Sequence, residues 1–185
     1  ELIEEGELLN QVPWDAIITS EGNEDEDDDE ETSLHCGTAR NVAEEMRLGP
    51  EGSEYGPYIG YLLTQREGQI PSAWSKEGQN LLLDILGGKT DAKLPPLDAL
   101  SWLEEDWYGS CNGDRDDAFA AHAAMLVVQR ADDDLMVPVY DLYNHRNGDY
   151  FNTRLTNNEG VNQEMRARRT IQPGEQLHNS YNLCD

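Results

Sequence analysis

Residues 118–141 read AFAAHAAMLVVQRADDDLMVPVYD and contain the change of pattern that decides the fold. In the first half, side chains that would share one helix face recur three and four positions apart, which is the spacing of an amphipathic helix. This inner face comprises Phe119, His122, Ala123, Leu126, Val127 and Arg130. In the second half, residues 135–141 are rich in apolar strand formers, which favours a β-strand. The chain is therefore expected to pass here from helical to strand-rich structure.

Helical patterning also fills the sequence upstream, from Cys36 to Arg130. Ser75 is placed to cap a helix that contains Leu81, Leu82 and Ile85 and that Gly87-Gly88 would end. Pro95-Pro96 is expected to open a second helix. Three aspartates just before Ala118 favour a helix N-terminus there, because the helix dipole attracts negative charge.

Strand patterns lie on both sides of this helical block. Before it, residues 2–19 are expected to form paired strands with a turn at Gly6. After it, further strands are expected at 150–156, 162–171 and 176–181. This order predicts an α+β fold of short β-sheets interrupted by a helical insertion. The predicted single domain, 1–185, comprises N-terminal strands (1–20), an acidic disordered loop (21–33), the helical insert (36–130) and C-terminal strands (131–185).

A short internal echo links the two ends of the chain. Residues 3–9 and 171–177 share the pattern I-x-x-G-E-x-L. In the second copy, Pro173-Gly174 favours a type II turn, since proline fixes φ and glycine accepts positive φ. We therefore expect two similar hairpins.

The composition limits the partners. Among 185 residues there are 38 acidic and 13 basic side chains, so the formal charge is -25, and nine acids fall within residues 21–31. Phosphates would be repelled by such a surface, which argues against nucleic acid and anionic membranes and suits a protein partner with a basic target segment. The most apolar stretch, 118–128, is too short to span a bilayer.

The cysteines and acids do not predict a metal site. Cys36, Cys111 and Cys184 are far apart and odd in number, so neither a disulfide framework nor a zinc site is expected, and a reducing intracellular compartment (cytoplasm, nucleus or plastid) is favoured. The acidic run lacks the alternating acids and the sixth-position glycine of a calcium loop.

Two polar motifs carry the chemistry. The first, Asp141-Leu-Tyr-Asn144-His145-Arg-Asn147-Gly148, follows an apolar stretch, where functional loops often occur. The second runs from Ala167 to Tyr181 and reads ARRTIQPGEQLHNSY. Together they resemble the SET-domain methyltransferases of the Rubisco large-subunit lysine methyltransferase and actin-histidine methyltransferase class, which carry D-x-x-N-H and then A-x-x-x-I-x-x-G-E-x-(Ile/Leu)-x-x-x-Y. The helical block resembles that class's insert at residues 55–59, 70–74 and 129–130.

The resemblance implies a role for each of five residues. Asn144 and His145 would hold S-adenosylmethionine, and Arg130 would bind the carboxylate of that cofactor through its bidentate guanidinium. Asp141 would orient the Asn-His loop or contact the cofactor's ammonium. Tyr181 would be the catalytic tyrosine, its ring among inward-facing groups beside the transferred methyl. No metal is implied.

Each residue also has a plainer interpretation. Arg130 suits the C-terminus of its helix, where a cation is favoured. Asn144 and Asp141 are common turn formers, His145 suits a loop, and Tyr181 suits a strand. His122, on the inner helix face, is expected to be a core histidine.

The chain departs from the family at both ends. The G-x-G strand that packs on the cofactor and the segments after the catalytic tyrosine are missing, so we expect a piece of a longer enzyme that binds S-adenosylmethionine poorly by itself. The expected reaction is methyl transfer from S-adenosylmethionine to a protein side chain, with lysine as the first target. The alternatives are histidine methylation and a catalytically silent SET module that serves as a protein-interaction platform.

Overall fold

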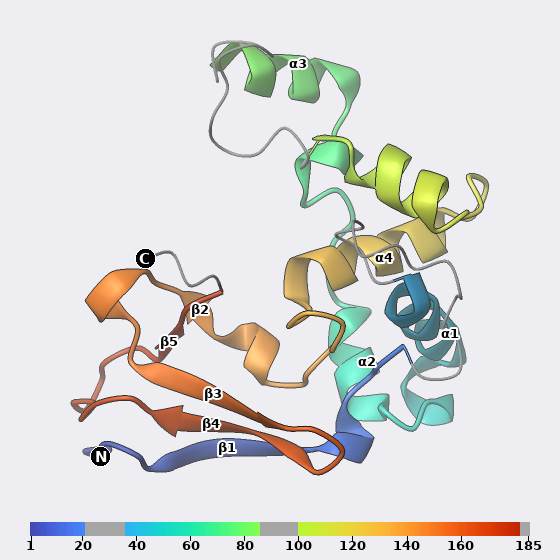
Figure 1. Ribbon diagram of the computed structural model, residues 1–185. Coiled ribbons are helices and arrows are strands. Elements are labelled where there is room, and N and C mark those ends of the chain that lie inside the picture. Colours follow the sequence, from blue (N-terminus) through green and yellow to red (C-terminus); the bar gives the residue numbers. More distant parts are fainter. Residues whose placement is uncertain (21–35, 86–99, 182–185) are drawn as a thin grey trace. The chain divides into compact units, whose positions relative to one another are not determined.

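The computed structural model describes residues 1–20, 36–85 and 100–181 (Figure 1). It contains both helices and small sheets, which confirms the predicted α+β class. The chain divides into two compact units. The β unit combines Glu1–Ile18 with Leu135–Asp185, and the helical unit spans Thr19–Asp134. These boundaries lie near the limits expected for the helical insert, 36–130. The acidic loop 21–33 lies outside the described residues.

Three antiparallel strands form the main sheet of the β unit, in the order β1 (Leu8–Pro13), β4 (Asn162–Ala167) and β3 (Thr153–Asn158) (Figure 1). The predicted strands 150–156 and 162–171 are both present, but the first is shifted to 153–158 and the second ends earlier, at Ala167. The prediction of paired strands within residues 2–19 is wrong, because β1 pairs with β4 from the far end of the chain. A local hairpin was the simpler inference from sequence, yet the long-range partner buries the apolar face of β1.

A small core holds the β unit together. Its fully buried members are Val12, Ile17, Leu135, Val137, Tyr140 and Met165. Burial of one such side chain stabilises the fold by about 1.5–3 kcal/mol. Leu9, Trp14, Ala16, Tyr143 and Leu155 pack against these residues from partly exposed positions. Side chains from both ends of the chain thus meet in one core.

The predicted strand at 135–141 is wrong. Within this stretch, Met136 forms a two-way backbone bridge with Ile18 whose N–O distances are 2.9 and 3.1 Å. Pro138 has no N–H to offer a ladder. Val139 follows with a φ of 71°, a left-handed conformation that is strained for a β-branched residue. The chain then forms a 3-10 turn, η5 (Tyr140–Leu142), instead of continuing extended.

The two echo segments form matching turns that pair with each other. Gly6 and Gly174 both have a φ of 82°, at the third position of the turns 4–7 and 172–175. In each turn the glutamate side chain accepts a hydrogen bond from the backbone N–H of the first turn residue, at 3.0 and 3.1 Å. An antiparallel bridge joins Ile3 to Ile171. The two expected turns are therefore present, but the expectation of two hairpins is wrong, because Ile3 pairs with Ile171 and Glu7 with Ala167 instead of across their own turns.

The helical unit contains α1 (Cys36–Gly52), α2 (Gly56–Leu62), α3 (Lys76–Ile85), the π-helix η4 (Leu103–Ser110) and α4 (Ala118–Arg130). Helix α1 packs on both α2 and α4. As predicted, α3 begins after Ser75, whose Oγ accepts the Gly78 N–H at 3.3 Å. Asp117 caps α4 by accepting the Ala120 N–H at 3.0 Å. The expected helix signals at 87–88 and 95–96 lie outside the described residues.

A disulfide joins Cys36, the first residue of α1, to Cys111, directly after η4, with a Cα–Cα distance of 5.3 Å. The expectation that no disulfide forms is therefore wrong. The two cysteines are 75 positions apart in sequence, and only the packing of the helical unit brings them together. The inference of a reducing compartment rested on unpaired cysteines and loses that support.

The described residues lack two kinds of feature. None of the helices there is both long and apolar enough to cross a bilayer. The same part of the chain holds no cluster of three or more His, Cys, Asp or Glu side chains that could bind a metal ion.

Candidate functional site

The β unit brings the two sequence motifs together through a second, two-stranded sheet. Strand β2 (Asn144–His145) runs parallel to β5 (His178–Asn179), with Asn144 opposite His178 and His145 opposite Asn179 (Figure 1). The Arg146 N–H extends this pairing by donating to the Asn179 carbonyl at 2.8 Å. Only residues 178–179 of the predicted strand 176–181 are extended in this way. These few hydrogen bonds place motifs more than 30 positions apart side by side.

Tyr181 contacts His145 directly. The backbone N–H of Tyr181 donates to Nδ1 of His145 at 3.0 Å, and the two ring centroids are 5.0 Å apart. An imidazole nitrogen that accepts a hydrogen bond carries no proton, so the neutral His145 ring is assigned its proton on Nε2. This interaction confirms the prediction that Tyr181 lies near the Asn144–His145 segment.

The predicted inward orientation of Tyr181 is wrong. Its side chain and backbone together are 56% exposed. Its hydroxyl donates to the backbone carbonyl of Tyr143. In turn, the Tyr143 hydroxyl donates to Oδ1 of Asn10 on β1 at 3.1 Å, so Tyr143 ties the site to the main sheet. Burial raises the pKa of the Tyr143 phenol.

Asp141 and Asn144 lie in the same unit, on η5 and β2. Asp141 is half-buried, with one carboxylate oxygen fully buried, and its N–H donates to the Val137 carbonyl at 3.3 Å. Asn144 is exposed, which leaves its side-chain amide accessible to a ligand. Both residues therefore share the β unit with His145 and Tyr181, while their cofactor roles stay predictions.

Arg130 belongs to the helical unit, in the last turn of α4. Its guanidinium donates to Oε1 of Gln65 at 2.8 Å and lies 5.2 Å from the centroid of the Tyr61 ring. These contacts all lie within the helical unit, and they fit the helix-end interpretation of this arginine. Its binding of a cofactor carboxylate stays a prediction.

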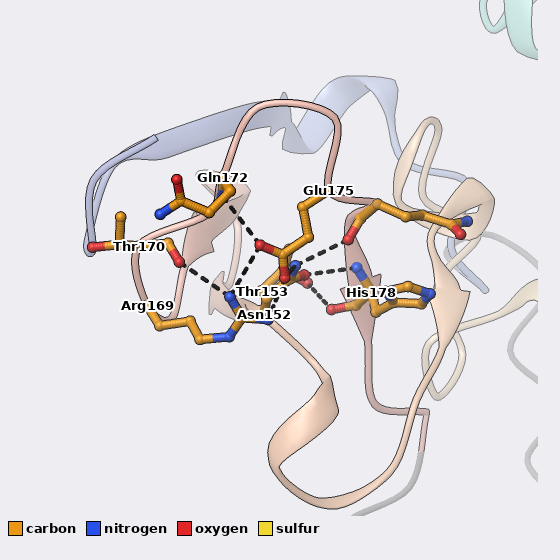
Figure 2. A network of polar contacts seen from close by, with 8 residues as sticks. Asn152, Thr153, Arg169, Thr170, Gln172, Glu175 and His178 are labelled. Atoms are coloured by element: carbon orange, nitrogen blue, oxygen red, sulfur yellow. Dashed lines mark hydrogen bonds and ion pairs between the residues drawn. The ribbon is translucent and has the colours of Figure 1, made fainter. Parts of the chain in front are cut away.

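A polar network that the sequence analysis missed supports the second motif (Figure 2). Asn152 is fully buried, and its side chain accepts the His178 N–H at 2.8 Å and donates to the Gln176 carbonyl at 2.9 Å and to Glu175 at 3.3 Å. Arg169 forms a bidentate ion pair with the Glu175 carboxylate. Asparagine is depleted in strands, so its place inside the expected strand 150–156 was the available signal.

Glu175 has an unusual acidity. The hydrogen bonds from Arg169 are the main cause, and the Gln172 N–H adds to them; together they lower the pKa of this carboxyl to about 2. The same pairing raises the pKa of Arg169. The glutamate of the G-E motif therefore stays ionised and holds the turn that precedes β5.

A cavity of about 330 Å³ lies beside these motifs, lined by Val139, Leu142, Tyr143, Gln176 and Leu177. Its walls are mostly apolar, with an amide and a phenol among them. The hollow is open to solvent, since Val139 is 50% and Leu142 52% exposed, and its lining suits the apolar part of a small ligand. A second cavity, of about 350 Å³, lies in the helical unit and includes His122. His122 is half-buried at this cavity, so its assignment to the core is only partly right.

No family model matches this chain, and a comparison with curated proteins finds no match either. The likeness to SET-domain methyltransferases therefore rests on the two motifs themselves.

Proposed function

We propose that this protein transfers a methyl group from S-adenosylmethionine to a lysine side chain of a protein substrate. The observation that carries the proposal is the β2–β5 pairing, which places Asn144-His145 beside the segment that ends in Tyr181. In the SET resemblance these are the cofactor-binding and catalytic motifs. This contact brings together two stretches that are remote in sequence.

The residues present suit such a ligand. The exposed Asn144 amide offers a donor and an acceptor, and the Asp141 carboxylate can accept from an ammonium group. The apolar cavity at Val139, Leu142 and Leu177 has room for part of a small molecule. When bound, S-adenosylmethionine supplies the methyl group on an activated sulfonium sulfur.

The chain's own task is then to prepare and align the amine. Desolvation disfavours the ammonium form, so a lysine that is desolvated as it enters gives its proton to water and attacks as the neutral amine. Tyr181 would align this nitrogen through its hydroxyl. Alignment of two reactants is one of the larger sources of rate acceleration.

A catalytically silent module is the second candidate, and one observation favours it. The Tyr181 hydroxyl already donates to the Tyr143 carbonyl, and the residue is more than half exposed. In this alternative the formal charge of -25 recruits a basic partner protein, and no methyl group is transferred. Histidine methylation is a variant of the enzyme proposal and differs only in the nitrogen that attacks.

The test is single-turnover transfer of a radiolabelled methyl group by the full-length protein to proteins of a cell extract, with Tyr181→Phe beside it. The variant removes one hydroxyl, and loss of one aligning contact typically costs on the order of 100-fold in rate. We expect kcat to fall that far with cofactor affinity nearly unchanged. Tyr150→Phe, at a tyrosine 74% exposed in the same unit, is the matched control.

Three outcomes separate the candidates. Amino-acid analysis of the labelled product distinguishes methyl-lysine from methyl-histidine. Equal rates for wild type and Tyr181→Phe would remove Tyr181 from the active site. Capture of basic proteins without binding of labelled S-adenosylmethionine would establish the silent module instead.

A further inference from the structure

We propose that Asn152 is a positioning residue that sets the place of Tyr181 through the backbone of β5. This inference deepens the proposed function and rests on it. Asn152 does not contact Tyr181, His145 or the cavity in any described interaction. It acts on Glu175 and Gln176, which come just before β5, and on His178 in β5 itself.

The side-chain contacts of Asn152 converge on one short segment, residues 175–178 (Figure 2). Its Oδ1 accepts the His178 N–H at 2.8 Å, and its own backbone N–H donates to the His178 carbonyl at 3.1 Å. Its Nδ2 donates to the Gln176 carbonyl at 2.9 Å and to Oε1 of Glu175 at 3.3 Å. Both sides of residue 177 are therefore held by a single asparagine. Thr153 adds a hydroxyl bond to the same His178 carbonyl at 2.9 Å.

Burial makes these bonds difficult to replace. Asn152 and Thr153 are both fully buried, so water does not compete for their partners. A buried polar group that loses its partner destabilises the fold, so these hydrogen bonds stay formed. On its other side, Asn152 is anchored by the Arg168 N–H, which donates to its backbone carbonyl at 2.9 Å. The segment 175–178 thus has one defined position.

That position is passed on to the candidate site. His178 and Asn179 pair with Asn144 and His145, and Tyr181 follows two residues later with its N–H on His145 Nδ1. A shift of β5 would therefore move Tyr181 relative to His145. Misplacement of an aligning group by about 1 Å can cost on the order of 100-fold in rate.

The test compares Asn152→Asp with Asn158→Asp. Asn152→Asp keeps the acceptor for the His178 N–H but loses both Nδ2 donors and places a carboxylate against Glu175. Asn158→Asp makes the same chemical change at the other end of β3, the strand that directly follows Asn152, at an exposed residue whose side chain bonds Asn162 at 2.7 Å. Nitrogen-15 NMR of the histidine rings reports the His145 tautomer without any need for activity, and a His145→Gln variant assigns its signals.

We expect Asn152→Asp to move the His145 signals away from those of the single Nε2-protonated tautomer. In the full-length protein, kcat should fall by about 10- to 100-fold, while KM for S-adenosylmethionine should change less than about twofold. Asn158→Asp should change neither. If Asn152→Asp does not fold, Thr153→Val, which removes only the hydroxyl bond to His178, should give a smaller shift of the same kind.

Several outcomes overturn the inference. If the His145 signals are unchanged in folded Asn152→Asp, Asn152 is only a structural residue, even if the melting temperature falls. Where Thr153→Val replaces that variant, its unchanged signals have the same meaning. A changed tautomer with no change in kcat would break the link to catalysis. Should wild type itself transfer no methyl group, the proposed function fails, and the tautomer shift alone then decides whether Asn152 positions Tyr181.

Discussion

Removal of the Cys36–Cys111 disulfide should destabilise the helical unit by a predictable amount. The bond closes a loop across 75 sequence positions and joins the start of α1 to the end of η4. Chain-entropy theory assigns about 4.5 kcal/mol to a loop of this length, because the crosslink restricts the unfolded chain. Measured losses for native disulfides are typically about 2–5 kcal/mol. We therefore expect 2–4.5 kcal/mol for the change Cys36→Ser with Cys111→Ser.

Packing adds a second term. Both cysteines are almost completely buried, at 3% and 1% exposure, so each serine places a hydroxyl in a space shaped for sulfur. An unsatisfied buried hydroxyl costs about 1–3 kcal/mol, which pushes the loss toward the upper end of the range. For a unit of this size, the melting temperature should fall by roughly 10–20 °C.

The assay is urea unfolding of the oxidised protein followed by far-UV circular dichroism, which reports the helices. The double variant is compared with wild type and with Cys184→Ser, a change at the third cysteine. Reduction of wild type should lower its urea midpoint to that of the double variant. Wild type and Cys184→Ser should have equal midpoints both before and after reduction. A non-reducing peptide map should contain the linked Cys36 and Cys111 peptides.

Coincident urea midpoints with equal slopes for the double variant and Cys184→Ser would refute the entropy reasoning. A peptide map without the linked pair would refute the disulfide itself. The free energy of unfolding could instead change only in its dependence on urea concentration, at an unchanged midpoint. That result would show that the substitutions change the compactness of the unfolded chain.

Three more predictions concern single side chains. Glu175→Gln removes a carboxylate whose pKa lies near 2 in the folded state and near 4.5 unfolded, so wild type should gain stability over the variant in urea unfolding as the pH rises from 2 to about 5; an equal pH slope for the two proteins would contradict this. Arg130→Lys in the full-length protein should weaken S-adenosylmethionine binding by calorimetry, because an ammonium cannot form a bidentate pair; unchanged affinity would assign Arg130 to the helix end. Tyr140→Phe should lower the free energy of unfolding in urea by about 1–3 kcal/mol, because the buried Asn179 amide loses the Tyr140 hydroxyl to which it donates at 2.6 Å. A loss below about 0.5 kcal/mol would contradict this expectation.

Local patterns predicted the elements that local chemistry determines. Ser75 before α3 and the apolar spacing of α4 identified two helices, because capping and burial of one helix face are readable from neighbouring residues. The echo at Gly6 and Gly174 predicted two like turns, because a glycine at positive φ and a glutamate one residue later are enough to make them.

What depends on tertiary contacts could not be predicted. The stretch 135–141 has the composition of a strand, but Pro138 and the left-handed Val139 turn it, and nothing in its apolar pattern reveals that turn. The Cys36–Cys111 pair and the choice of β4 as partner of β1 depend on how distant segments pack.

At the candidate site, sequence located the residues but not their surroundings. The motifs identified Asn144, His145 and Tyr181, and the structure places these three together. The sequence did not predict the exposure of Tyr181, because exposure depends on the neighbouring segments. It also did not predict that Asn152 is buried, since single-sequence patterns treat an asparagine as a surface or turn residue.

The bridge between Ile18 and Met136 has a consequence for how this chain can change over evolutionary time. The helical unit is one uninterrupted segment, and the chain leaves the β unit and returns to it at adjacent, hydrogen-bonded positions. Doubling the length of a segment between such fixed ends adds only about 0.6 kcal/mol of closure entropy. Insertions, deletions or the exchange of the whole segment should therefore change the stability of the β unit little. The segment can then diversify in sequence while the paired motifs of the β unit stay in place.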